Sequence, residues 1–335
     1  MEKDTTTFPF QNVTYSNMTG IRKPKPQLAV AVVMFLFGAI GNIIALLFLF
    51  TSKKTHKWKP FFRLVGSLAL TDLTGNILVF PVIMHSSASN YTFVFPPGLC
   101  EFISFIWAFS FMASAMLVCF MSIDRFLAIA FPFFYNTNKK VRRVNIMILT
   151  AWFLSAFISI LHIFGLGSAK NFFPGSWCFI NFTSTDQLNR INTYIYAISG
   201  MLVLFCTVVV NISVIIWICK GQMQKNRKKR NIFVIVLLVC LVVILAVTWA
   251  PLMYQMLKSA SSANPKDGKS ELLAVRMALI NGIVNPWLYI MLRRENFVAL
   301  YRFCKEKRDD STTASKSGGL SSSNDNIERT VMSSV

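Results

Sequence analysis

One guanidinium inside an apolar run is the group of this chain whose chemistry is easiest to define. Arg276 lies between the apolar stretches 273–275 and 277–280. A guanidinium binds a carboxylate through two parallel hydrogen bonds, and apolar walls supply most of the affinity for a ligand with long hydrocarbon arms. The alternative is an arginine that extends to the membrane–water interface. The depth of Arg276 within its run favours an anion site for a lipid acid.

Other polar groups also lie inside apolar runs, where they are costly and commonly functional. Asp72, Ser114, Asn281 and Asn285 offer oxygen ligands suited to a hard cation, or to a water-filled hydrogen-bond network. We expect no other cofactor and no metal beyond this one cation. Asp72 and Asp124 are deep in the chain's apolar segments, but no nucleophile accompanies them with a base and an orienting group. We therefore expect a protein that is not an enzyme.

Three further motifs are placed where helices could bend or end. Asp124-Arg125 closes the third apolar run. In the sixth run, Trp249 precedes Pro251, and a proline frees a backbone carbonyl and permits a kink. The seventh run ends with a motif that contains Asn285, Pro286 and Tyr289.

The elements that must position these residues are membrane-spanning helices. The chain is 54% hydrophobic and only 14% charged, whereas soluble domains carry about 25% charged residues. A helix needs about 20 apolar residues to cross a bilayer. Seven runs meet this need: Leu28–Phe50, Phe61–Ser86, Leu99–Ala130, Val144–Phe164, Tyr194–Cys219, Ile232–Leu257 and Leu272–Leu292. The predicted fold is an all-α membrane protein, a seven-transmembrane helix bundle with a short amphipathic eighth helix.

The basic residues predict the orientation of this bundle. The net charge is +20, and Lys and Arg collect after the first, third, fifth and seventh runs, which places these segments inside. Because the basic residues flank apolar runs, we expect no binding to nucleic acid. The predicted divisions are an extracellular glycosylated N-terminus (1–27), the transmembrane domain (28–293), a membrane-surface helix (294–304) and a disordered cytoplasmic tail (305–335).

Sequons and cysteines agree with this orientation. Four sequons fall on predicted outside segments, at Asn12, Asn17, Asn90 and Asn181. Cys100 and Cys178 are also in outside segments, where disulfides persist, so we expect them to be bonded. Cys304 lies beside basic residues on the inside, which is typical of a palmitoylation site.

Taken together, the motifs resemble those of the rhodopsin-like (class A) G-protein-coupled receptors. The motifs are Gly41-Asn42, Leu68-Ala69-Leu70-Thr71-Asp72, Asp124-Arg125-Phe126, Trp152, Trp249-Ala250-Pro251 and Asn285-Pro286-Trp287-Leu288-Tyr289. Six motifs in order over seven runs make a specific match. The resemblance implies a multi-pass plasma-membrane receptor that activates a heterotrimeric G protein. It also implies an activation switch, formed by Asp124, Arg125, Trp249, Pro251, Asn285, Pro286 and Tyr289. The resemblance further implies that the Asp72 cluster binds sodium in the resting state.

The second outside loop and the seventh run narrow the resemblance. The loop 174–180, the stretch around Arg276 and the absence of a proline from the fifth run are similar to prostanoid receptors, most of all the prostaglandin E type-four branch. The resemblance implies a prostanoid ligand, with prostaglandin E2 as the first candidate, and a stimulatory G protein that raises cAMP. The expected ligand-binding residues are Arg276, Ser176, Trp177, His85 and Ser87. The tyrosine that these receptors place at the outer end of the second helix is absent from residues 83–87, and His85 is the candidate substitute.

Other ligands and partners follow from the same resemblance. Another lipid acid or a peptide is the alternative ligand; a transporter that relays an ion through Asp72 and Arg276 is the alternative from another class. An amine receptor would need a carboxylate in the outer half of the third run, where none follows Glu101. Phosphorylation of Ser and Thr residues from Ser311 onward would attract arrestin through receptor kinases. The C-terminal residues 333–335 are typical of a ligand for PDZ domains.

Overall fold

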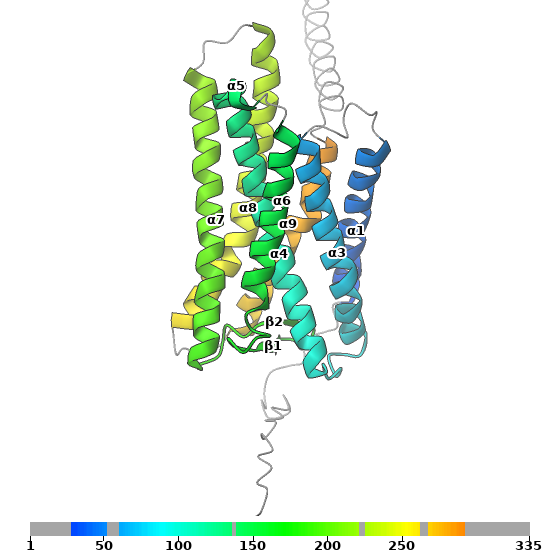
Figure 1. The fold of residues 1–335 in the computed structure, drawn as a ribbon. Helices are drawn as coiled ribbons and strands as arrows, with labels where there is room; N and C mark the ends of the chain where they lie inside the picture. The colour runs from blue at the N-terminus through cyan, green and yellow to red at the C-terminus, as the bar shows by residue number, and fades with distance from the viewer. Residues whose placement is uncertain (1–27, 52–59, 136–138, 221–224, 262–266, 292–335) are drawn as a thin grey trace, which may run out of the picture.

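The computed structural model describes residues 28–51, 60–135, 139–220, 225–261 and 267–291. Their long helices stand side by side in one bundle, with a two-stranded hairpin across one end (Figure 1). We call this end the hairpin end. The helices are α1 (Leu28–Thr51), α3 (Pro60–Ala88), α4 (Pro97–Ala130), the short α5 (Pro132–Tyr135), α6 (Lys140–Ile160), α7 (Gln187–Lys220), α8 (Lys225–Ser261) and α9 (Gly268–Met291).

The apolar runs form helices because hydrocarbon offers the backbone no hydrogen-bond partner outside the helix itself. Six of the described helices are long and apolar enough to cross a membrane, and α9 is the seventh member of the bundle. Arg276, Asn281 and Asn285 lower the hydropathy of α9. Large apolar side chains such as Phe153 (70% exposed) and Leu149 (62% exposed) point away from the bundle, as a lipid-facing surface requires.

Helix α4 is the centre of the bundle. It packs against α3, α6 and α7, and 72% of its most apolar stretch is buried, compared with 28% for α1. At the other side, α9 packs against α1 and α8. Gly200 on α7 permits a close approach to α8, because a Cβ atom there would lie 2.8 Å from the Trp249 ring.

The predicted helix ends required correction at several places. Helix α7 begins at Gln187 rather than Tyr194, because Asp186 accepts a hydrogen bond from the backbone N–H of Asn189 (3.2 Å) and starts the helix in polar sequence. Helix α9 begins before Leu272 for the same reason, since Asp267 accepts from the backbone N–H of Lys269 (3.1 Å). Helix α6 ends at Ile160 although the apolar run continues to Phe164.

The sequence did not predict the hairpin. Strand β1 (Ala169–Phe172) pairs antiparallel with β2 (Trp177–Ile180), with Ala169 opposite Ile180 and Phe172 opposite Trp177. All four β2 residues are buried. The Phe172 ring stacks on Trp177 and on Phe182, with ring centroids 4.6 Å apart in both pairs. These stacked rings give a four-residue strand the apolar contacts that its length alone would not supply.

Candidate ligand site and switch residues

A narrow hollow with a volume of about 40 Å³ lies near the hairpin end, between α1, α3, α4, α9 and the hairpin. Most of its wall is apolar, and its polar members include one arginine. The lining consists of Val30, Ala31, Met34, Phe80, Ile83, Ser87, Tyr91, Trp107, Ser176, Trp177, Leu272, Val275, Arg276 and Leu279.

Four of the five expected ligand-binding residues line this hollow. Arg276 is partly buried in the α9 wall, while Ser87 and Ser176 are buried. Trp177 also lines the hollow, and its Nε1–H donates to the carbonyl of Phe173 (2.8 Å). One positive group and several hydroxyls therefore face an apolar space.

His85 is not among the lining residues. Its side chain is exposed, and its ring packs edge-on against Phe93 with centroids 5.0 Å apart. The structure therefore places His85 on the exposed side of α3 rather than in the hollow. The cause is the helical position of His85, which faces away from the side of α3 that carries Ser87.

Tyr91 is a lining residue that the sequence reasoning missed. Asn90 and Tyr91 both have positive φ (53° and 61°), and the Tyr91 N–H donates to the carbonyl of Ser86 (2.9 Å). This left-handed turn folds the chain back over the end of α3, so that Tyr91 reaches the hollow that Arg276 also lines. The sequence signal for this turn is the pair Ser89-Asn90, which lies just after residues 83–87.

The hairpin closes one side of the hollow and is fixed by two links near its tip. The predicted disulfide between Cys100 and Cys178 is present, with Cα atoms 5.3 Å apart. At the tip, the Ser86 hydroxyl donates to the carbonyl of Gly175 (2.8 Å). Gly175 has a φ of +108°, a conformation that glycine adopts without strain. These links hold Ser176 and Trp177 against the hollow.

Three of the four polar residues predicted at mid-bundle are joined by hydrogen bonds. Asp72 accepts hydrogen bonds from the Ser114 hydroxyl and from Asn285 Nδ2 (3.5 Å). Asn281 is buried on the same helix as Asn285, and its Oδ1 has no hydrogen-bond partner among the described residues. A carboxylate, a hydroxyl and amide oxygens fit the preference of a hard cation for oxygen ligands.

The opposite end of the bundle carries the Asp124-Arg125 pair. Asp124 is buried, and its carboxylate lies 3.7 Å from the Arg125 guanidinium. The Tyr135 hydroxyl donates to Asp124 Oδ1 (3.1 Å), and burial together with Asp124 raises the pKa of Tyr135 to about 12. The guanidinium also lies over the Phe61 ring, 4.0 Å from its centroid. Tyr135 thus stays a hydrogen-bond donor at neutral pH.

The other predicted switch residues lie along α8 and α9. Trp249 is buried and its Nε1 has no hydrogen-bond partner within the described residues. Pro251 lies inside α8, and Asn285 and Pro286 are buried in α9. The side chain of Tyr289 lies outside the described residues.

The remaining predicted modification sites are only partly covered. Asn90 is exposed, and Asn181 accepts from the Thr183 hydroxyl (3.4 Å); both are at the hairpin end. Asn12, Asn17 and Cys304 lie outside the described residues, as do the expected surface helix and the tail.

The profile of the family described as 7 transmembrane receptor (rhodopsin family) matches residues 41–289. The chain belongs to this family. It is therefore a multi-pass membrane receptor and not an enzyme. Squid rhodopsin has a similar fold, with a TM-score of 0.73 and 18% sequence identity over 83% of this chain and 80% of that one.

Curated relatives of this receptor include two human proteins. The human prostaglandin E2 receptor EP3 subtype is 28% identical, over 88% of this chain and 83% of the relative. The human prostaglandin E2 receptor EP4 subtype is 27% identical, over 80% of this chain. The alignment spans 64% of the length of the EP4 relative.

Proposed function

We propose that this chain is a receptor for a prostanoid, with prostaglandin E2 as the first candidate, and that binding activates a heterotrimeric G protein. The observation that carries the proposal is the hollow that joins one guanidinium, Arg276, to hydroxyl groups and to apolar walls. The names of the relatives, which are 27–28% identical, support the same ligand class.

The polar groups define how an acid would bind. The carboxylate pairs with the Arg276 guanidinium, and the hydroxyls of Tyr91 and Ser176 donate hydrogen bonds beside it. The hydrocarbon arms then contact the apolar side chains of α1, α3 and α9. In this arrangement Tyr91, which follows α3, takes the position for which the sequence offered only His85.

The proposal includes an orientation and a route for the signal. The hairpin end faces the exterior with the N-terminus, and the Asp124-Arg125 end faces the cytoplasm and the G protein. Ligand binding next to α9 changes the packing of Trp249 and of the Asn285-Pro286 segment, and this releases Arg125 from Asp124. A sodium ion at Asp72 stabilises the resting state.

Two further partners act on the cytoplasmic tail. Receptor kinases phosphorylate the Ser and Thr residues from Ser311 onward, and arrestin binds the phosphates. Palmitoylation of Cys304 anchors the preceding segment to the membrane, and residues 333–335 bind a PDZ domain. These residues lie in the part of the chain beyond residue 291, which the structure does not describe.

A prostanoid panel tests the proposed ligand. The receptor is reconstituted with stimulatory, inhibitory and phospholipase-activating G proteins, and nucleotide exchange is measured with each prostanoid acid. We expect at least one acid to promote exchange, and a matching change of cAMP or calcium in cells. If the surface-expressed receptor promotes no exchange with any prostanoid, but does so with another lipid acid or a peptide, the ligand assignment is wrong.

A further inference from the structure

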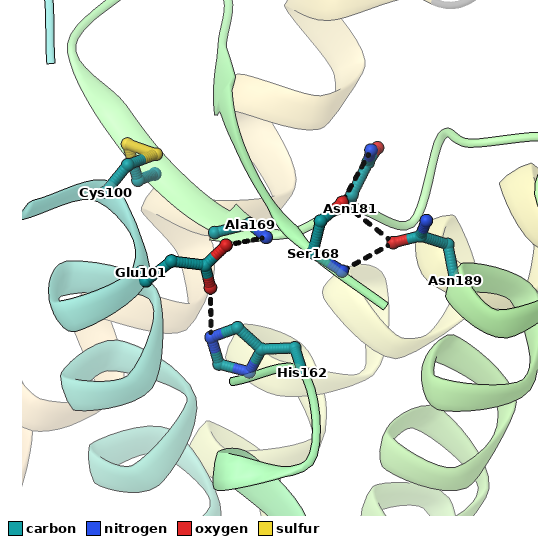
Figure 2. Close-up of polar contacts among 8 residues, drawn as sticks. Cys100, Glu101, His162, Ser168, Ala169, Asn181 and Asn189 are labelled. Atoms are coloured by element: carbon teal, nitrogen blue, oxygen red, sulfur yellow. Dashed lines mark hydrogen bonds and ion pairs between the residues drawn. A yellow bond between two sulfur atoms is a disulfide. The ribbon is translucent and has the colours of Figure 1, made fainter. Parts of the chain in front are cut away.

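Charged side chains at the two ends of the bundle are held by different kinds of partner. At the hairpin end, Glu101 on α4 accepts a hydrogen bond from the Ala169 N–H (3.0 Å), and its other oxygen lies 3.3 Å from Nε2 of His162, which follows α6 (Figure 2). A polar group of another element therefore faces each oxygen of this carboxylate. At the opposite end, the partner that another described helix supplies to Arg125 is an aromatic ring.

The Arg125 guanidinium lies over the ring of Phe61. Its central carbon is 4.0 Å from the ring centroid, well within the distance of about 6 Å at which the face of an aromatic ring attracts a cation. Phe61 is the second residue of α3, which packs along α4, and its ring is packed against the buried core. A planar, weakly hydrated guanidinium is suited to this position.

The ion pair between Arg125 and Asp124 is long and lies within one helix. The guanidinium is 3.7 Å from the carboxylate, which also accepts a hydrogen bond from the Tyr135 hydroxyl (3.1 Å). Arg125 Nε has no hydrogen-bond partner among the described residues. Because Asp124 and Arg125 are neighbours on α4, their pair does not join α4 to another element. The stack on Phe61 is the contact that ties Arg125 to α3.

The sequence excludes an acidic partner for Arg125 on α7 or α8. No acidic residue follows Asp186 until Asp267, so neither helix carries a carboxylate. The first six residues of α8, 225–230, instead include five basic ones, and this end of α8 lies at the same end of the bundle as α5 (Figure 1). Like charges repel, so the position of Arg125 depends on its contacts with α3 and α4.

We propose that Phe61 is a further residue of the activation switch, and that its ring holds Arg125 in the resting position beside Asp124. The proposal rests on the proposed function, in which release of Arg125 from Asp124 accompanies activation of a G protein. A contact that is present in one state and lost in the other shifts the equilibrium by its own free energy. For a cation over a ring, this corresponds to a change of about 2- to 30-fold in the ratio of the two states.

Fluorinated phenylalanines at position 61 test the stack in the full-length receptor. Fluorine withdraws electrons from the ring face while the ring keeps its shape, so one, two and three fluorines should weaken the attraction stepwise. Nucleotide exchange without ligand is measured at equal surface expression with stimulatory, inhibitory and phospholipase-activating G proteins. We expect exchange to rise with each fluorine, by about 2- to 30-fold in total.

Two further substitutions separate the stack from a general effect of fluorine. Phe131 is an exposed ring that follows α4 and packs edge-on against Phe126, so the same fluorines at position 131 should leave exchange unchanged. Phe61→Leu removes the ring face altogether and should raise exchange at least as much as three fluorines. The fluorinated variants keep the test valid if Phe61→Leu fails to fold.

A second measurement does not require a G protein. Three fluorines at position 61 should lower the thermal midpoint of the ligand-free receptor, and this shift should vanish when Arg125→Gln has removed the cation. A midpoint shift without nucleotide exchange on any variant would overturn the coupling to a G protein, and the role of Phe61 in a switch with it, but not the stack itself.

Three results would overturn the role of Phe61 alone in a receptor that does promote exchange. They are exchange that the fluorines at position 61 leave unchanged or reduce, an equal rise when Phe131 carries the fluorines, and a midpoint shift that persists in Arg125→Gln.

Discussion

Replacement of Arg276 is the sharpest perturbation of the candidate ligand site. Arg276→Ala removes the one guanidinium in the lining and leaves the carboxylate of an acid ligand without its charged partner. Loss of one member of a buried, hydrogen-bonded charge pair costs about 2–5 kcal/mol. Because Arg276 is only partly buried, we expect the lower part of this range, about 2–3 kcal/mol. The equilibrium dissociation constant should then rise roughly 30- to 160-fold.

Two conservative variants separate charge from geometry. Arg276→Lys keeps the charge but loses the paired hydrogen bonds, so it should restore only part of the affinity. Tyr91→Phe keeps the ring in the wall and removes one donor, which should cost about 1.5–3 kcal/mol if the hydroxyl bonds the carboxylate directly. Leu273, an exposed neighbour on α9, supplies a control substitution, Leu273→Ala, that should leave affinity unchanged.

The assay is competition binding of a prostanoid acid and its methyl ester on cells with equal surface expression. The ester should bind weakly to the unmodified receptor and lose little more on Arg276→Ala, because it lacks the charge that Arg276 recognises. If the acid and the ester lose affinity equally, Arg276 has a structural role and the anion site is refuted.

Three further predictions concern the mid-bundle cluster, the disulfide and the opposite end. Sodium should lower agonist affinity relative to a large inert cation, and Asp72→Asn should abolish this difference; equal affinities in the unmodified receptor would exclude the sodium site. Replacing Cys100 and Cys178 together by alanine should cost about 2–4 kcal/mol of stability, seen as a lower thermal midpoint of the ligand-free receptor, and an unchanged midpoint would contradict a stabilising role. Tyr135→Phe removes a donor to the buried Asp124 carboxylate and should also lower that midpoint, by an amount equivalent to about 1.5–3 kcal/mol; no change would show that water replaces the hydroxyl.

The sequence predicted the helices well because a membrane span has a strong and local signal. Apolar runs located the seven long helices of the described residues, and Arg276 inside one of them located a wall of the hollow. The polar first turns of α7 and α9, which begin at Gln187 and Gly268, were not predicted. A carboxylate stabilises each of these turns, and an apolar run does not indicate such a turn.

Contacts between distant segments were harder to predict. The hairpin strands have four residues each, and their burial depends on rings that stack across the turn. Tyr91 was missed because two left-handed residues redirect the chain after α3. Glu101 and His162 are 61 positions apart in the sequence, and nothing in their local surroundings indicates that they meet.

The disulfide also has a consequence for biosynthesis. Its cysteines are 78 residues apart, and the intervening chain contains two long helices, α4 and α6. Each crossing of the bilayer moves the chain to the other compartment, so the two thiols meet only when both helices have crossed or neither has. A nascent chain in which α6 fails to insert leaves Cys178 in the compartment opposite Cys100. Formation of the bond therefore requires that α4 and α6 either both cross the membrane or both fail to cross it.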